Sequence, residues 1–225
     1  MIPLKDDNPT RTVPYVNYGI IALNVLIFGY MLTLVPQENE RFVQHYSVVP
    51  SVFFSRAGLE RPAYYLNIIS SMFLHGGLFH LGGNMLFLWV FGDNIEDYLG
   101  HARYILFYLL CGTASVVAQG VMSSGSDLPM LGASGAISGV LGAYILLYPR
   151  AGVWTFFFFI FFFQVIKVPA VFILGLWIVL QFINGFFSIS SGVGGVAWFA
   201  HIGGFFSGVV LILLLKRRNI YSRLA

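Results

Sequence analysis

Charged residues and cysteine are both scarce in this chain of 225 residues. Asp, Glu, Lys and Arg make up 9% of the sequence, hydrophobic residues make up 58%, and the mean hydropathy is +0.81. Soluble globular domains carry about 25% charged residues, so this composition excludes that class and indicates a membrane protein. The single cysteine, Cys111, excludes an intrachain disulfide, and its apolar surroundings favour a packing role.

Six stretches of the sequence are long and apolar enough to form helices that cross a bilayer, each of which needs roughly 20 residues. They span residues 18–35, 74–91, 104–122, 131–148, 170–187 and 196–215. We therefore predict an all-α membrane protein, a six-transmembrane-helix bundle that occupies residues 18–215. A polar segment (1–17) precedes this bundle and a basic tail (216–225) follows it.

Two segments outside these stretches need a separate interpretation. Residues 36–71 join the first and second stretches and mix charged with aromatic side chains, which is typical of a long loop lying in the membrane interface. Residues 153–163 contain seven phenylalanines but are too short to span a membrane alone. They are expected to form an interfacial or re-entrant segment, and a seventh span is the less favoured alternative.

The distribution of basic residues predicts an orientation in the membrane. With six spans, both termini share one side, and that side holds nine of the 12 Lys and Arg residues, leaving only Arg41, Arg56 and Arg61 on the other. The positive-inside rule then predicts a multi-pass protein of the cell membrane with both termini in the cytoplasm. The lipid bilayer is its expected environment, and no nucleic acid is expected as a partner.

Ser134 and His201 are the polar residues in these stretches that point to chemistry. Each lies near the start of an apolar stretch. Polar groups at membrane depth are costly and are functional candidates, and a histidine beside a serine can activate its hydroxyl as a nucleophile. The six stretches contain no Asp or Glu. We therefore predict a Ser–His catalytic dyad toward the outer face, which suggests peptide-bond hydrolysis inside a membrane.

His80 and Asn84 supply a second part of the expected site. They are four residues apart and hence lie on one face of a helix, and both side chains can donate a hydrogen bond to an oxyanion. Free N–H groups at the start of the helix that carries Ser134 would add further donors. Metal binding is the competing use of histidines, but no carboxylate or cysteine stands at ligand spacing. The residues therefore do not favour a metal site.

Helix packing is the competing explanation for the small residues around Ser134 and His201. G-x-x-x-G patterns at residues 135–139 and 204–208 permit close helix contact in lipid. The two explanations are compatible, because a tight contact between these stretches would bring the two side chains together. The stretch 170–187 is rich in phenylalanine and lacks such a pattern. It is expected to pack loosely, opposite that contact, and to admit a substrate sideways.

The order and spacing of these residues resemble the rhomboid family of intramembrane serine proteases. The resemblance covers about residues 70–208 and rests on four motifs. These are His75-x4-His80-x3-Asn84, Gly92-Asp93-Asn94-Ile95-Glu96-Asp97, Gly132-Ala133-Ser134-Gly135 and Ala200-His201-x2-Gly204-x3-Gly208. The resemblance implies that Ser134 is the nucleophile and His201 the general base, and that His80, Asn84 and the Ser134 backbone N–H form an oxyanion hole. It also implies transmembrane protein substrates, cut within or near their transmembrane segment, and neither metal nor cofactor.

Two positions depart from the pattern of some bacterial members. Leu66-Asn67 stands where those members have a Trp-Arg pair, and Ser138 stands where they have a tyrosine under the histidine. The second departure leaves open what orients His201. The main alternative function is a catalytically silent rhomboid-like protein that binds membrane helices. A small-solute transporter is less favoured, because no internal repeat with charged residues near mid-membrane is visible.

Overall fold

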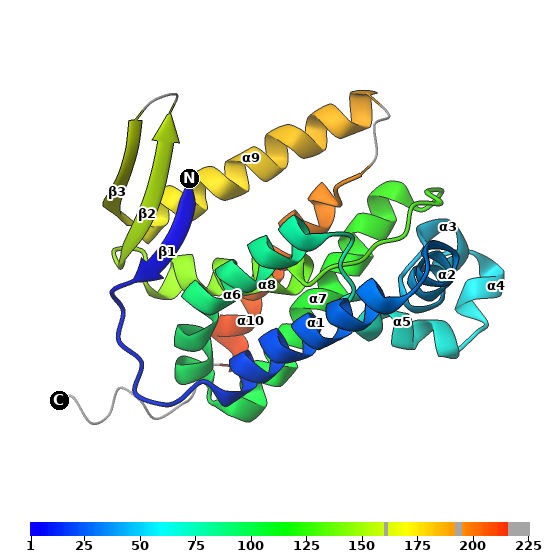
Figure 1. The fold of residues 1–225 in the computed structure, drawn as a ribbon, viewed down its shortest axis with the longest axis horizontal. Coiled ribbons are helices and arrows are strands. Elements are labelled where there is room, and N and C mark those ends of the chain that lie inside the picture. The colour runs from blue at the N-terminus through cyan, green and yellow to red at the C-terminus, as the bar shows by residue number, and fades with distance from the viewer. Residues whose placement is uncertain (160–161, 192–194, 216–225) are drawn as a thin grey trace.

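Four helices form the centre of the fold in the computed structural model, which describes residues 1–159, 162–191 and 195–215 (Figure 1). They are α6 (Leu78–Leu99), α7 (His101–Ser123), α8 (Ser134–Leu147) and α10 (Trp198–Leu215). Ten of the 14 residues of α8 are buried, and α10 packs extensively against both α8 and α7. The helix that begins at Ser134 is therefore enclosed by its neighbours.

Two further long helices lie at the periphery of this centre. The first, α1 (Tyr15–Thr33), packs on α6, and α9 (Ala170–Ser191) packs mainly on α10. Figure 1 shows α9 running diagonally away from the other helices toward its C-terminal end. Its outward side chains are large and apolar, as expected where lipid replaces water: Phe172, Phe182, Phe186 and Phe187 are all exposed.

Four of the described helices are long and apolar enough to cross a membrane, namely α1, α7, α9 and α10. The chain is thus a mostly helical membrane protein. The other two predicted spans correspond to α8, which is apolar but short, and to α6, which carries three acidic residues in its last turns. The count of six spans stays a prediction.

The segment between α1 and α6, predicted as one long loop, contains four short helices. They are α2 (Pro36–Tyr46), α3 (Pro50–Phe53), α4 (Arg56–Leu59) and α5 (Ala63–Ser71). Prolines at the first helical position favour the starts of α2 and α3. The Asn67 amide nitrogen donates to the carbonyl oxygens of His45 and Ser47, both at 2.9 Å, and so fixes α5 against the end of α2.

The structure also contains a three-stranded antiparallel sheet, so the all-α prediction is wrong. β1 (Ile2–Asp6) pairs with β2 (Gly152–Phe159), and β2 pairs with β3 (Phe162–Pro169). Aromatic and β-branched residues fit a pleated surface well, which explains why the phenylalanine-rich segment forms a hairpin here. The sheet stands beside the start of α9 (Figure 1). Where it lies relative to the membrane stays a prediction.

A polar network joins the N-terminal segment to the last turns of α6. Glu96 is fully buried, and its two carboxylate oxygens accept from the backbone N–H groups of Val16 and Asn17 at 3.0 and 2.7 Å. Asp97 accepts from the backbone N–H of Thr12 at 2.8 Å. The Gly92–Asp97 motif therefore anchors the predicted polar segment 1–17 at the end of α6 that lies away from His80.

Asp6, the last residue of β1, and Asp7, which follows it, tie β1 to α8 and to the other two strands. Asp7 forms an ion pair with Lys167 of β3 and accepts from the Trp154 indole N–H of β2, and the Lys167 contact lowers the pKa of Asp7. Asp6 accepts a hydrogen bond from Tyr144 on α8. The basic tail predicted at 216–225 lies outside the described residues.

Candidate active site

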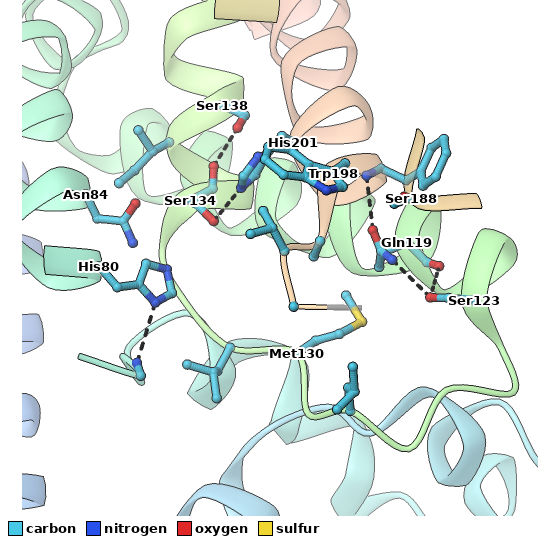
Figure 2. Close-up of a pocket in the computed structure, with 18 of the residues that line it drawn as sticks. His80, Asn84, Gln119, Ser123, Met130, Ser134, Ser138, Ser188, Trp198 and His201 are labelled. Carbon is cyan, nitrogen blue, oxygen red and sulfur yellow. Dashed lines mark hydrogen bonds between the residues drawn. The ribbon is translucent and has the colours of Figure 1, made fainter. Parts of the chain in front are cut away.

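Ser134 and His201 lie together at the starts of their helices (Figure 2). The Ser134 Oγ is 2.9 Å from the His201 Nε2, a hydrogen-bond distance. Ser134 is the first residue of α8 and His201 lies in the first turn of α10. The chain enters α8 through Gly132, whose φ of 121° lies in the region that favours glycine.

A glycine seam between α8 and α10 sets this distance. A Cβ atom on Gly204 would lie 2.0 Å from the Gly135 carbonyl oxygen, and one on Gly208 would lie 2.0 Å from that of Gly139. Any side chain at these positions would force the backbones apart. The close helix contact predicted from the two G-x-x-x-G patterns is therefore confirmed, and it lies directly beside Ser134.

The other ring nitrogen of His201 contacts Gln181, a residue that the sequence analysis did not identify. The Gln181 Oε1 is 2.8 Å from the His201 Nδ1, and the Gln181 Nε2 donates to the Trp177 carbonyl oxygen at 3.0 Å. Both residues belong to α9, and the Trp177 ring lies 5.8 Å from the His201 ring between centroids. A lone glutamine in a long apolar stretch was a signal that could have indicated this role.

The start of α10 is held by Gln119 of α7, which was also missed. Its Oε1 accepts from the backbone N–H groups of Phe199 and Ala200 at 3.1 and 3.2 Å, and its Nε2 donates to Ser123 at 3.0 Å (Figure 2). The first N–H groups of a helix have no partner within the helix. Gln119 therefore fixes the turn that carries His201.

His80 and Asn84 of α6 face the loop that leads into Ser134. A Cβ atom on Gly132 would lie 2.7 Å from the His80 Nε2 and 3.7 Å from the Asn84 Nδ2, so both nitrogens lie against this backbone. Asn84 is held by the buried His75, whose Nε2 is 2.9 Å from its Nδ2. The structure thus places both predicted oxyanion donors near Ser134.

A cavity of about 880 Å³ is bordered by α6, α7, α8, α9 and α10 and is lined by Ser134, His201, His80, Asn84 and Gln119. Small-molecule pockets measure about 300–1,000 Å³, so a short peptide segment is of suitable size. Phe79 and Ile189, both exposed, lie on its border. Ser134, His80 and Asn84 therefore face a single space.

Ser138 occupies the position where the resemblance leads one to expect a tyrosine. Its Oγ donates to the carbonyl oxygen of Ser134, one turn earlier in α8, at 2.6 Å (Figure 2). The side chain is almost fully buried. Ser138 thus satisfies a backbone group in the first turn of α8, the turn that begins with Ser134.

Comparison with known proteins identifies the family to which this chain is similar. The family model described as the rhomboid domain matches residues 62–218. The chain is 29% identical over 199 residues to the mitochondrial rhomboid protein 1 of Saccharomyces cerevisiae, covering 86% of this chain and 51% of the relative. It is 36% identical over 134 residues to the human mitochondrial presenilin-associated rhomboid-like protein, covering 59% and 32%. It is 32% identical over 132 residues to the rhomboid protease GluP of Bacillus subtilis, covering 59% and 24%.

The two mitochondrial relatives contradict the predicted cell-membrane location. The yeast and human proteins are named as mitochondrial. The assignment of cytoplasmic and outer sides rested on the positive-inside rule for a cell membrane and falls with that location. The chain spans about half of the yeast relative and a third or less of the other two.

Proposed function

The chain belongs to the rhomboid family, and from that premise we propose that it is an intramembrane serine endopeptidase. In this proposal Ser134 is the nucleophile and His201 the general base. The observation that carries it is the 2.9 Å contact between the Ser134 Oγ and the His201 Nε2, within a membrane protein and on the wall of a cavity. A hydroxyl in that position can pass its proton to the ring as it attacks a carbonyl.

The proposed reaction follows from the positions of these atoms. Ser134 Oγ attacks the carbonyl carbon of a peptide bond while His201 Nε2 takes the hydroxyl proton, and that proton then goes to the leaving amine. Charge that develops on the carbonyl oxygen is stabilised by hydrogen bonds from His80, Asn84 and the Ser134 backbone N–H. Water then hydrolyses the acyl-enzyme in a second step that uses the same base.

The substrates in this proposal are membrane-anchored proteins, cut within or near their transmembrane segment. The cavity borders on α9, a helix whose outward face is apolar and exposed, so a substrate helix can reach it from the lipid. A continuous helix hides its carbonyl groups in internal hydrogen bonds. We therefore propose that the segment unwinds locally and that glycine or other weak helix formers near the cut favour cleavage.

The proposed membrane arrangement has six spans, formed by α1, α6, α7, α8, α9 and α10. α6 and α8 are each flanked by apolar helices that meet the length requirement alone, and a short or partly charged span is tolerated when protein surrounds it. The mitochondrial relatives support a mitochondrial membrane as the site of action. Fractionation of cells that express the tagged chain tests this location.

Labelling with a serine-directed fluorophosphonate probe tests the proposed chemistry. Purified protein in detergent is expected to be labelled, and Ser134→Ala and His201→Ala are expected to abolish labelling. Ser207→Ala is a matched control, because this serine lies in α10 and its hydrogen bonds go to the Gly204 carbonyl oxygen and to Cys111, not to Ser134 or His201. Co-expression of the chain with single-span candidate substrates then tests cleavage. Absence of both labelling and cleavage would favour a helix-binding protein without catalysis.

A further inference from the structure

The contact between Gln181 and His201 has a defined polarity. The Gln181 amide nitrogen can only donate, and it donates to the Trp177 carbonyl oxygen at 3.0 Å. This bond fixes which end of the amide faces His201, and the end that faces it is the oxygen Oε1, 2.8 Å from Nδ1. An amide oxygen can only accept. The His201 Nδ1 must therefore carry the proton in this bond.

This proton position decides what the other nitrogen of the ring can do. A neutral imidazole carries one N–H and one bare nitrogen, so protonation at Nδ1 leaves Nε2 with a free lone pair. That lone pair faces the Ser134 hydroxyl at 2.9 Å. The opposite tautomer would place an N–H there, and the ring could not accept the serine proton. Gln181 thus selects the tautomer that can act as a base.

The burial of Gln181 makes the loss of this bond costly. Gln181 is only 6% exposed, and a buried amide without partners is costly. Within the described residues, the His201 ring forms hydrogen bonds with Gln181 and Ser134, and neither of these partners is a carboxylate. Trp177 and Trp198 lie against the same ring. The His201 ring therefore contacts one amide oxygen, one hydroxyl group and two indole rings.

We propose that Gln181 is a positioning residue that holds His201 in its base-competent tautomer, an inference that rests on the proposed function. In serine proteases with a triad, a carboxylate performs this task for the histidine. Here a neutral amide from α9 takes that place, while the histidine belongs to α10. The orientation of the base consequently depends on these two helices remaining in contact.

The test combines kinetics with a direct measurement of the tautomer. Gln181→Met keeps the length of the side chain but removes the acceptor, and Gln181→Glu keeps an oxygen that accepts from Nδ1. The matched control is Leu180→Met, since Leu180 is the exposed neighbour on the same helix. Histidine labelled with ¹⁵N in the full chain reports which ring nitrogen carries the proton. His201→Ala identifies the signals of His201 among those of the five histidines.

The expected result has three parts. His201 shows a proton on Nδ1 in the parent and a mixture of tautomers in Gln181→Met. The same variant loses about tenfold in kcat and in the rate of fluorophosphonate labelling, the scale of one neutral hydrogen bond, while KM changes less than twofold. Gln181→Glu recovers most of that rate, and Leu180→Met behaves as the parent in every measurement.

Two results would overturn the inference. One is an unchanged tautomer in Gln181→Met. The other is a loss of rate that follows KM or the melting temperature alone, which would make Gln181 a packing residue. A failure of the proposed function is distinguishable from both, because the parent itself would then neither label nor cleave, while the ¹⁵N signals would still report the tautomer.

Discussion

The carbonyl oxygen of Gly135 fills the space that a side chain on Gly204 would need. A Cβ atom at residue 204 would lie 2.0 Å from that oxygen, closer than real atoms approach. The contact is one residue after Ser134 and three residues after His201 along their helices. The backbone separation of α8 and α10 at this point therefore determines whether the serine and the histidine can share a hydrogen bond.

Gly204→Ala is expected to separate the two helices and to lower both stability and activity. The added methyl group must push against backbone rather than against a flexible side chain, and such overpacking costs about 1–3 kcal/mol. Cleavage rate and melting temperature in detergent are the measurements. Gly29→Ala on α1 is the matched control, because a Cβ there meets nothing within 4 Å. If Gly204→Ala were as active and as stable as the parent, the proposed role of the glycine seam would be wrong.

Ser134→Ala and His201→Ala are each expected to abolish cleavage while the chain remains folded and inserted. A nucleophile and its base act as a unit, so loss of either member removes the activation of the hydroxyl. Co-expression with a cleaved single-span protein, followed by immunoblotting of the product, measures this. The proposed dyad would be wrong if either variant retained near-parental turnover.

Asn84→Ala is expected to reduce the rate without abolishing it. Loss of one oxyanion donor costs roughly 10²–10³ in rate in another serine protease, and His80 together with the backbone N–H can compensate in part. The fall should appear in kcat, with the melting temperature close to that of the parent. Parental cleavage by Asn84→Ala would reduce its role to the bond with His75.

A crosslink between α9 and α6 is expected to block cleavage of a membrane-embedded substrate. Phe79→Cys and Ile189→Cys place thiols on two exposed residues that border the same cavity. A reducible bifunctional thiol reagent joins them, and each single variant is the control, with Cys111 buried in all of them.

The expected sideways entry of a substrate past α9 predicts two further results of this experiment. Labelling by the small fluorophosphonate probe should continue in the crosslinked protein, because only the passage of a helix is blocked, and cleavage should return on reduction. Unchanged cleavage with the crosslink fully formed would show that the substrate does not enter past α9.

Glu96→Gln is expected to lower stability and to free the N-terminal segment. The carboxylate accepts from two backbone N–H groups, and an amide can accept only one of them while turning a donor toward the other. Hydrogen bonds to a buried charge are worth about 1.5–3 kcal/mol. Limited proteolysis near residues 8–17 measures the release of the segment. Glu60→Gln, on an exposed pair with Arg56, should change neither property.

The sequence by itself determined the membrane class, and it identified the candidate site residues and the helices that carry them. Long apolar runs cannot be stable in water, so composition alone decided the class. Polar side chains at membrane depth are costly and mark candidate functional sites, and this made four residues recognisable: Ser134, His201, His80 and Asn84. The glycine seam was predictable because small residues four apart form one helix face.

Only the tertiary structure decided which distant residues meet. The sheet joins residues 2–6 to a hairpin about 150 positions later. Pairing between strands so far apart produces no periodic pattern in either segment, and the all-α prediction was wrong for this reason. Neither Gln181 nor Gln119 belongs to a recognisable sequence motif. Gln181 contacts His201 because of how α9 packs against α10, and Gln119 contacts the first turn of α10 because of how α7 packs there. Hydrogen bonds need distances within a few tenths of an ångström. Such distances are set by helix packing and not by the order of residues along the chain.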